Sequence, residues 1–185
     1  MAEGAIGPTL CSREQIAATI ERLATKLASD YRGQLLLLLG VLKGAICFTA
    51  DLARALARQA DGPSEIMVDY ISVQRYGSLG SSGGRARLAM DCGRSIEGAN
   101  VLIADDIADN GRTLEFLQSL LKQRRPASLR TCTLFDRPAR REVDVPIDYP
   151  GIVIPNVFAI GYGLDYKEVY RNLPYLAEFR EGTTV

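Results

Sequence analysis

The sequence predicts an α/β fold in which a mainly parallel central sheet is flanked by helices. Short apolar segments alternate along the chain with segments whose apolar residues recur at helical spacing, and this alternation is typical of parallel sheets. Residues 34–41 are almost continuously apolar, as expected for a strand buried on both faces. The chain has 185 residues, 47% of them hydrophobic, and neither an internal repeat nor a linker divides it. We therefore expect a single domain, 1–185, with a sizeable core.

The first half of the chain predicts two helices and three strands. Ser12 and Gln15 have the spacing of a capping box, and apolar residues at helical spacing follow them. The stretch RYGSLGSSGG, residues 75–84, is rich in glycine and serine and predicts a long mobile loop. The other expected elements are strands at residues 34–41, 65–73 and 85–90, and a second helix at about 45–58.

The second half predicts three more strands and one helix. The helix is amphipathic, and a proline follows it closely. The strands are expected at residues 100–104, 129–135 and 157–160, and the helix is marked by Leu114, Leu117 and Leu121. Because ligands bind at the carboxyl ends of the strands in such sheets, the loops that follow strands should carry the function.

Composition excludes several classes of function. The chain has 22 basic and 22 acidic residues, so its formal net charge of +0 gives no global attraction to nucleic acid or to an anionic membrane. No apolar run is long enough to span a bilayer, and the start of the chain lacks the pattern of a secretory signal. The four cysteines are widely spaced without a CxxC pair, which favours reduced cysteines and a cytoplasmic protein.

The absence of histidine narrows the chemistry further. It removes Ser-His-Asp and Cys-His catalysis as well as histidine-ligated metals. A general base must then be a carboxylate, lysine, tyrosine or cysteine. A metal is expected to be a hard, oxygen-bound ion such as magnesium.

A short apolar strand leads into the most informative segment, which reads DDIADNGRT. Asp105 and Asp106 follow the strand directly, and Asp109 comes next. Gly111 permits a tight turn, and Thr113 stands where a helix would begin, so free N–H groups there can hold a phosphate. The acids suit ribose hydroxyls, which need acceptors, or magnesium, which needs oxygen ligands. The segment therefore predicts a site for a sugar phosphate; the alternative is a solvated acidic turn.

This segment strongly resembles the phosphoribosyl pyrophosphate signature of the type I phosphoribosyltransferases. One residue departs from the signature, since Asn110 stands where the family usually has threonine or serine. The resemblance implies that Asp109 handles the proton at purine N7 and that Asp105 and Asp106 hold the ribose and metal side. The residues that it implies for the 5′-phosphate are Asp109, Asn110, Gly111, Arg112 and Thr113.

Two further segments resemble the hypoxanthine-guanine branch of this family. The segment GVLKG contains Leu42, Lys43 and Gly44, and alone it would suggest only a turn with a solvated lysine. In the branch, the Leu-Lys peptide is cis and lines the pyrophosphate site. The pair Arg75 and Tyr76 matches a Ser-Tyr pair in a loop that closes over the active site, so the tyrosine carries over and the serine does not.

The basic segment LFDRPARR and the segment IPNVFAIGYGLDY complete the resemblance. The branch commonly has lysine where Arg137 stands, reaching the 6-oxo oxygen of the purine, and Arg141 matches a position near pyrophosphate. A solvated basic turn remains the alternative for Arg141. In the second segment the resemblance implies base stacking by Phe158, reading of the base edge by the Ala159 backbone, contact of Asp165 with the base region and a magnesium-bound water, and pyrophosphate binding by Arg171.

The resemblance covers nearly the whole chain after the first helix. It implies a type I phosphoribosyltransferase fold with a small hood built from the N-terminal segment and roughly residues 150–185. The implied enzyme uses Mg2+ and transfers 5-phosphoribose from phosphoribosyl pyrophosphate to N9 of hypoxanthine or guanine, giving IMP or GMP and pyrophosphate. A homodimer or homotetramer is expected.

Two alternatives stay open at this point. A nucleotide-sensing, RNA-binding regulator can be built on the same fold, although the neutral net charge argues against the basic surface that it needs. A phosphoribosyltransferase for another base is the second, and the segment from Phe158 to Asp165 argues instead for a 6-oxopurine.

Overall fold

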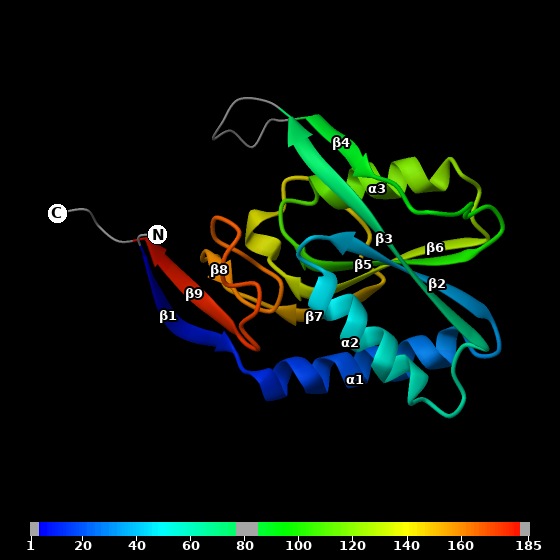
Figure 1. Ribbon diagram of the computed structural model, residues 1–185, viewed down its shortest axis with the longest axis horizontal. Helices are drawn as coiled ribbons and strands as arrows, with labels where there is room; N and C mark the ends of the chain where they lie inside the picture. Colours follow the sequence, from blue (N-terminus) through cyan, green and yellow to red (C-terminus); the bar gives the residue numbers. More distant parts are fainter. Residues whose placement is uncertain (1–3, 77–84, 182–185) are drawn as a thin grey trace.

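The computed structural model describes residues 4–76 and 85–181, which form two sheets and three α-helices (Figure 1). The main sheet has six strands in the order β4-β3-β2-β5-β6-β7, and a smaller sheet has the order β1-β9-β8. The elements in chain order are β1 (Gly4–Cys11), α1 (Arg13–Asp30), β2 (Leu35–Leu42), α2 (Ile46–Ala57), β3 (Glu65–Tyr76), β4 (Arg85–Met90), β5 (Asn100–Ala108), α3 (Arg112–Lys122), β6 (Ser128–Asp136), the 3-10 turn Pro138–Arg140, β7 (Tyr149–Val153), β8 (Ala159–Ile160) and β9 (Leu176–Glu181).

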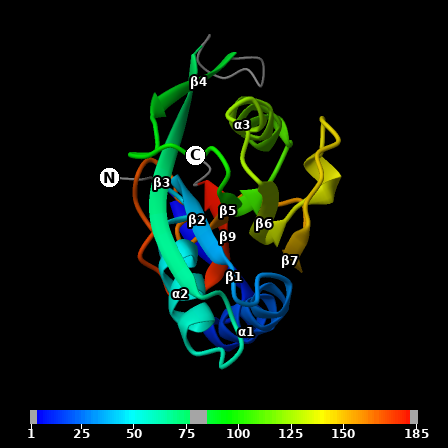
Figure 2. The same cartoon turned by 90° about the vertical axis from the view of Figure 1, so that its right-hand side faces the viewer.

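Helices cover both faces of the main sheet. Figure 2 shows α3 on one side of this sheet and α1 with α2 on the other. Along β2, Leu36 and Leu38 pack with the residues of α1 and α2, whereas Leu37 and Leu39 pack with those of α3. Successive side chains of a strand point to opposite faces of the sheet. Because helices cover both faces, all four leucines are fully buried. The α/β fold and the doubly buried strand predicted from the sequence are confirmed.

The order of the strands creates a crevice between β2 and β5. Strand β2 pairs in parallel with β3 on one side and with β5 on the other, so the chain reverses its direction of travel across the sheet between them. Such a switch point opens a crevice beyond the carboxyl ends of the two strands, where ligands bind. In Figure 1 these ends face the small sheet, so the loops after β2 and β5 lie between the two sheets.

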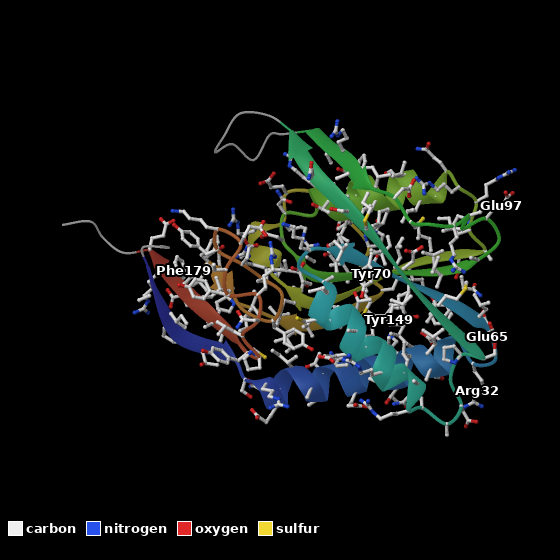
Figure 3. All side chains as sticks on the ribbon, viewed as in Figure 1. Arg32, Glu65, Tyr70, Glu97, Tyr149 and Phe179 are labelled. Carbon is white, nitrogen blue, oxygen red and sulfur yellow. The ribbon has the colours of Figure 1, made fainter. Side chains whose placement is uncertain are left out.

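The small sheet joins the two ends of the described chain. Strand β1 runs antiparallel to β9, and β8 also pairs antiparallel with β9. In Figure 3, Phe179 of β9 lies in this region, and it packs with the buried Ile160 and Ala177. A small sheet built from the chain ends agrees with the predicted fold class. The sequence pattern predicts no strand at the positions of β1, β7 and β9.

Three predicted strand boundaries were wrong. Strand β5 continues past residue 104, because Asp105 pairs with Thr133 and Ala108 with Asp136 on β6. The first two acids therefore belong to the strand and not to the loop after it. Strand β3 continues past residue 73 to Tyr76 because it pairs with β4, and residues 77–84 of the predicted loop lie outside the described residues. Strand β8 has only two residues, so residues 157 and 158 precede it.

The start of α1 has the capping box predicted from the sequence. The Gln15 backbone N–H donates to the Ser12 hydroxyl at 3.3 Å, and the Ser12 backbone N–H donates to Gln15 Oε1 at 2.8 Å. Two N–H groups that the helix itself leaves unpaired are thereby satisfied. Among the helices in the described ranges, none is both long and apolar enough to cross a membrane.

We predict that Ser12→Ala lowers the free energy of unfolding by about 1 kcal/mol, the usual cost of losing a capping hydroxyl. Urea denaturation monitored by circular dichroism measures this change. Ser29→Ala is the matched control, because Ser29 is exposed within the same helix, where alanine is well tolerated. Equal effects of the two substitutions would contradict a capping role for Ser12.

Candidate active site

A cleft of about 220 Å³ lies at the switch point of the main sheet. Val73 of β3 borders it, and three further segments form the rest: the end of β2 with the loop after it, the end of β5 with the loop that follows, and the first turn of α3. The sequence motifs predict a site in each of those three segments. The lining residues are Val41, Leu42, Gly44, Val73, Asp105, Asp106, Ile107, Asp109, Asn110, Gly111, Thr113 and Leu114.

Asp105 and Asp106 place two carboxyl groups side by side in this cleft. Burial raises the pKa of Asp105 well above its ordinary value, and the neighbouring charge of Asp106 raises it further. Burial also raises the pKa of Asp106, although hydrogen bonds and the positive charge of Arg171 oppose this effect. The Asp106 N–H donates to Asp105 Oδ1 at 3.0 Å, which fixes one carboxyl group relative to the next residue. The pair is suited to hold a cation or to accept hydrogen bonds from hydroxyl groups.

The loop after β2 approaches this pair through a glycine. A Cβ atom added to Gly44 would lie 1.6 Å from Asp106 Oδ2, so a side chain at residue 44 would collide with the carboxyl group. Gly163 approaches from the other side, since a Cβ atom added there would lie 1.8 Å from the Gly44 carbonyl oxygen. The peptide between Leu42 and Lys43 is cis, as the resemblance implied.

The turn before α3 is tight, as the glycine at position 111 predicts. Gly111 adopts a φ of +88°, and a Cβ atom added there would lie 2.5 Å from the Val143 carbonyl oxygen, so only glycine fits. Asn110 stabilises the turn with its side chain, whose Oδ1 accepts the Arg112 N–H at 3.2 Å. The Arg112 side chain donates to Glu142 at 2.8 Å. The turn therefore offers backbone and Thr113 atoms to the cleft, while the Arg112 side chain is directed to Glu142.

Asp109 is held by Arg137 in a two-point contact. Arg137 Nε donates to Asp109 Oδ1 at 3.0 Å, and Arg137 Nη2 lies 2.9 Å from Asp109 Oδ2. Arg137 Nη1 donates to the Val157 carbonyl oxygen. Paired hydrogen bonds between a guanidinium and a carboxylate are strong and directional. The resemblance implies separate contacts of Asp109 and Arg137 with the base, and it gives no sign that the two residues bind each other.

Arg141 lies behind the turn that precedes α3. Its Nη2 donates to the Ala108 carbonyl oxygen at 3.2 Å and to Asp136 Oδ1. A Cβ atom added to Gly111 would lie 3.1 Å from Arg141 Cδ, so the side chain supports the backbone of the turn. The alternative of a solvated basic turn does not apply to Arg141, because its side chain is largely buried and paired.

The segment before β8 presents an aromatic ring to solvent. Phe158 is 49% exposed, and its ring meets Tyr166 edge-on at a centroid distance of 5.8 Å and Phe179 at 6.1 Å. The Phe179 N–H donates to the Phe158 carbonyl oxygen at 2.7 Å, which anchors the backbone. Ala159 follows as a buried residue of β8. A ring that is held at its edges and open at the surface is suited to stack on a planar ligand.

Arg171 connects the C-terminal segment to the cleft. It donates to the Gly163 carbonyl oxygen at 2.7 Å and lies 2.8 Å from Asp165 Oδ1. Glu168 lies 3.4 Å from Arg171 and 2.9 Å from the Lys43 ammonium group. The Lys43–Glu168 pair is largely exposed, so it contributes little to stability. Through these contacts, Lys43, Asp165 and Arg171 belong to one charged cluster beside Gly44.

Sequence analysis missed three residues of this region. Glu168 joins Lys43 to Arg171, Gly163 contacts Gly44, and Asp136 binds Arg141. The closely spaced glycines at 161 and 163 were a usable signal, since both adopt positive φ angles where the chain folds back. Glu168 and Asp136 carried no signal of this kind. The side chains of Arg75 and Tyr76, assigned to a closing loop, lie outside the described part of the structure.

We predict that Asp105→Asn stabilises the metal-free protein near neutral pH. Because the folded-state pKa is raised above 3.8, the stability contributed by the protonated carboxyl group is present below that value and is lost as the pH rises through the folded-state pKa. Asparagine does not ionise, and its Oδ1 can still accept the Asp106 N–H.

Urea titrations in EDTA should give the variant the larger free energy of unfolding near neutral pH. The difference should shrink as the solution is acidified toward 3.8, the ordinary pKa of the carboxyl group. Asp144→Asn, at an exposed position, is the control. If the difference in free energy of unfolding between Asp105→Asn and the wild type does not change with pH, the raised pKa of Asp105 does not explain it.

The phosphoribosyl transferase domain model matches residues 10–167. A hypoxanthine-guanine phosphoribosyltransferase of Mycobacterium tuberculosis is 44% identical over 179 residues, which cover 94% of this chain and 86% of the relative. The bifunctional protein TilS/HprT of Listeria innocua is 41% identical over 171 residues, and the match spans only 26% of its length. A solved structure of Trypanosoma cruzi hypoxanthine phosphoribosyl transferase has a TM-score of 0.87 and 40% identity, with 95% of this chain and 92% of that chain covered. The chain belongs to the phosphoribosyl transferase family.

Proposed function

We propose that the protein transfers 5-phosphoribose from phosphoribosyl pyrophosphate to N9 of hypoxanthine or guanine and releases pyrophosphate. The observation that carries the proposal is the meeting of the acidic pair, the glycine turn and the Gly44 loop in one cleft at the switch point. Relatives that match this chain over most of their own length bear the name of this activity, including one from Streptococcus agalactiae that is 39% identical. These relatives support a 6-oxopurine as the acceptor.

The 5′-phosphate is assigned to the first turn of α3. Its amides and the partial positive charge of the helix end favour an anion, and Gly111 lets the backbone approach closely. Asp105 and Asp106 then face the ribose, whose hydroxyl groups need acceptors. The bond from the sugar to pyrophosphate breaks as the purine attacks, through a transition state with oxocarbenium character.

Pyrophosphate is assigned to the Gly44 loop and Arg171. Gly44 lines the cleft, and because residue 44 has no side chain the loop can lie directly against Asp106. Arg171 has a buried Nε that makes no hydrogen bond within the described residues. A buried donor of this kind is costly unless a ligand supplies the acceptor. An anionic leaving group would satisfy that need.

The residues fit a magnesium ion. Among the described residues, no three His, Cys, Asp or Glu side chains gather into a metal site. Magnesium is usually held by one or two carboxylates together with water and substrate phosphates, and the buried carboxyl groups of Asp105 and Asp106 supply such a pair. Asp105 and Asp106 would hold the ion, and Asp165 would contact a water bound to it. Bound magnesium offsets the negative charge on the leaving group.

The test is a panel of adenine, guanine, hypoxanthine, xanthine and uracil incubated with phosphoribosyl pyrophosphate and magnesium, with nucleotide formation followed by chromatography. We expect guanine and hypoxanthine to be the best acceptors and excess EDTA to abolish turnover. Nucleotide formed only from adenine or uracil would overturn the assignment of the acceptor. Full turnover in EDTA, with metal carry-over excluded, would overturn the role of magnesium.

We predict that Asp109→Asn lowers kcat by about 100- to 10,000-fold, the usual contribution of a positioned general acid or base. The chain has no histidine, and Asp109 lines the cleft beside the turn to which the 5′-phosphate is assigned. Asparagine keeps the shape of the side chain but loses its charge and basicity. The affinity for phosphoribosyl pyrophosphate should change much less, because the amides of the turn remain.

Steady-state kinetics and direct binding separate these two effects. Asp144→Asn is the control, since it removes an exposed carboxylate elsewhere. If Asp109→Asn turns over at close to the wild-type rate while chemistry is rate-limiting, Asp109 does not handle the proton.

A further inference from the structure

Tyr162 links the C-terminal segment beside the cleft to helix α2. Its hydroxyl donates to Asp51 Oδ2, and Asp51 belongs to α2, the helix that follows the Gly44 loop directly (Figure 1). Tyr162 is a buried residue, and it is not among those that line the cleft. Burial and the hydrogen bond to Asp51 raise the pKa of Tyr162, so the hydroxyl keeps its proton and remains a donor.

The backbone at Tyr162 has a conformation that tyrosine rarely adopts. Its φ is +49°, and the neighbouring Gly161 and Gly163 have φ angles of +101° and +103°. Glycine adopts such angles readily, whereas a bulky side chain makes them unfavourable. Residues in this state persist where surrounding contacts hold them, and they cluster at functional sites. Here the Tyr162 N–H donates to the Leu173 carbonyl oxygen at 2.8 Å and the hydroxyl donates to Asp51, so both ends of the residue are held.

The same stretch of backbone fixes the guanidinium of Arg171. Arg171 Nη1 donates to the Gly163 carbonyl oxygen at 2.7 Å, and the Gly163 N–H donates to the Arg171 carbonyl oxygen at 2.9 Å. Gly163 also lies against the Gly44 carbonyl oxygen, and the positive charge of Arg171 acts on Asp106. A shift of Tyr162 therefore moves the Gly163 carbonyl oxygen, and the Arg171 guanidinium follows it.

We propose that Tyr162 is a positioning residue for the pyrophosphate subsite, the part of the cleft formed by the Gly44 loop and Arg171, and that it acts by linking Gly163 to α2. The inference rests on the proposed function, because that function assigns pyrophosphate to this subsite. Tyr162 itself touches no substrate. Arg171 Nε is buried and makes no hydrogen bond within the described residues, so its direction decides whether this donor meets an anion.

Tyr149 provides a matched contrast elsewhere in the fold. Its hydroxyl donates at 2.8 Å to Asp30, the last residue of α1, and Tyr149 is also buried. Both tyrosines therefore bind an aspartate of a helix, but Tyr149 lies on β7, at the edge of the main sheet, and does not line the cleft. If the Tyr162 hydroxyl only stabilised the fold, removing either hydroxyl would have the same kind of effect.

The experiment compares Tyr162→Phe with Tyr149→Phe, since each removes one hydroxyl and keeps the ring. Two probes are titrated in magnesium with no acceptor base present: phosphoribosyl pyrophosphate by calorimetry, and ribose 5-phosphate, which lacks the pyrophosphate group, by nuclear magnetic resonance. We expect Tyr162→Phe to weaken binding of phosphoribosyl pyrophosphate about tenfold, within the range that hydrogen bonds to charged groups contribute. Binding of ribose 5-phosphate should stay within about twofold, because the amides of the turn before α3 are untouched. Tyr149→Phe should bind both probes as the wild type does.

A wild-type affinity of Tyr162→Phe for phosphoribosyl pyrophosphate overturns the proposal. An equal loss of affinity for both probes also overturns it, because the hydroxyl would then support the fold in general and not the pyrophosphate subsite.

A second pair of variants decides the question even where Tyr162→Phe fails to fold. Asp51→Ala removes the acceptor of the Tyr162 hydroxyl and also the partner of Arg54, which lies 2.7 Å from Asp51 Oδ1. Arg54→Ala removes only that exposed ion pair. We expect Asp51→Ala to reproduce the loss of affinity for phosphoribosyl pyrophosphate and Arg54→Ala to bind it as the wild type does. Equal behaviour of these two variants overturns the proposal.

The wild-type protein separates this inference from the proposed function. A wild type that binds phosphoribosyl pyrophosphate no more tightly than ribose 5-phosphate would refute the pyrophosphate subsite, and with it the proposed function. A wild type that binds phosphoribosyl pyrophosphate more tightly, with the same affinity retained in Tyr162→Phe and Asp51→Ala, would overturn only the role of Tyr162.

Discussion

The close approach of Asp106, Gly44 and Gly163 is the constraint on which the arrangement of the cleft depends. Three segments meet there: the end of β5, the loop after β2 and the C-terminal segment before β9. The room that a Cβ atom would occupy at Gly44 is filled by a carboxylate, and the room at Gly163 by a backbone carbonyl. Two glycines therefore bring the cis peptide, the acidic pair and the Arg171 cluster into one site. A side chain at either position would force these parts away from one another.

The acidic pair lowers the stability of the folded protein, and interactions elsewhere in the fold offset this loss. Burial disfavours the charged forms of Asp105 and Asp106, and their proximity adds repulsion. The strand that carries them is held by pairing with β2 and β6 and by apolar side chains buried on both faces of the sheet. Destabilising groups of this kind are characteristic of functional sites, where local rules are broken and the surrounding core maintains the fold.

Local patterns predicted the parts of the fold that depend on local interactions. The capping box at Ser12 and the buried leucines of β2 could be predicted because each is defined within a few neighbouring residues. Strands β1 and β9 were missed, since each is stabilised by pairing with a partner at the other end of the chain. The true end of β5 was also missed, because it depends on pairing with β6, which extends the strand past its apolar run.

The same difference between local and long-range interactions decided which parts of the site could be predicted from the sequence. The turn at Gly111 and the cis peptide at Leu42 could be anticipated from contiguous motifs and their resemblance to a family. The partners of Arg137 could not, since Asp109 lies 28 residues away in sequence and Val157 lies 20 residues away. Only the meeting of β5, β6 and the segment before β8 brings those atoms together.

Pairing of charges within the protein explains how a chain of zero net charge can bind the highly anionic substrate that we propose. Arg137 binds Asp109, Arg141 binds Asp136 and Arg171 binds Asp165, so the three arginines assigned to substrate are each joined to an aspartate. These aspartates neutralise the arginines and fix their planes, and each guanidinium has more donors than one carboxylate can accept. Recognition of the anion then depends on donors held in fixed directions and on helix-end amides. A large positive potential is not needed, which is why the overall composition gave no sign of an anionic ligand while the local motifs did.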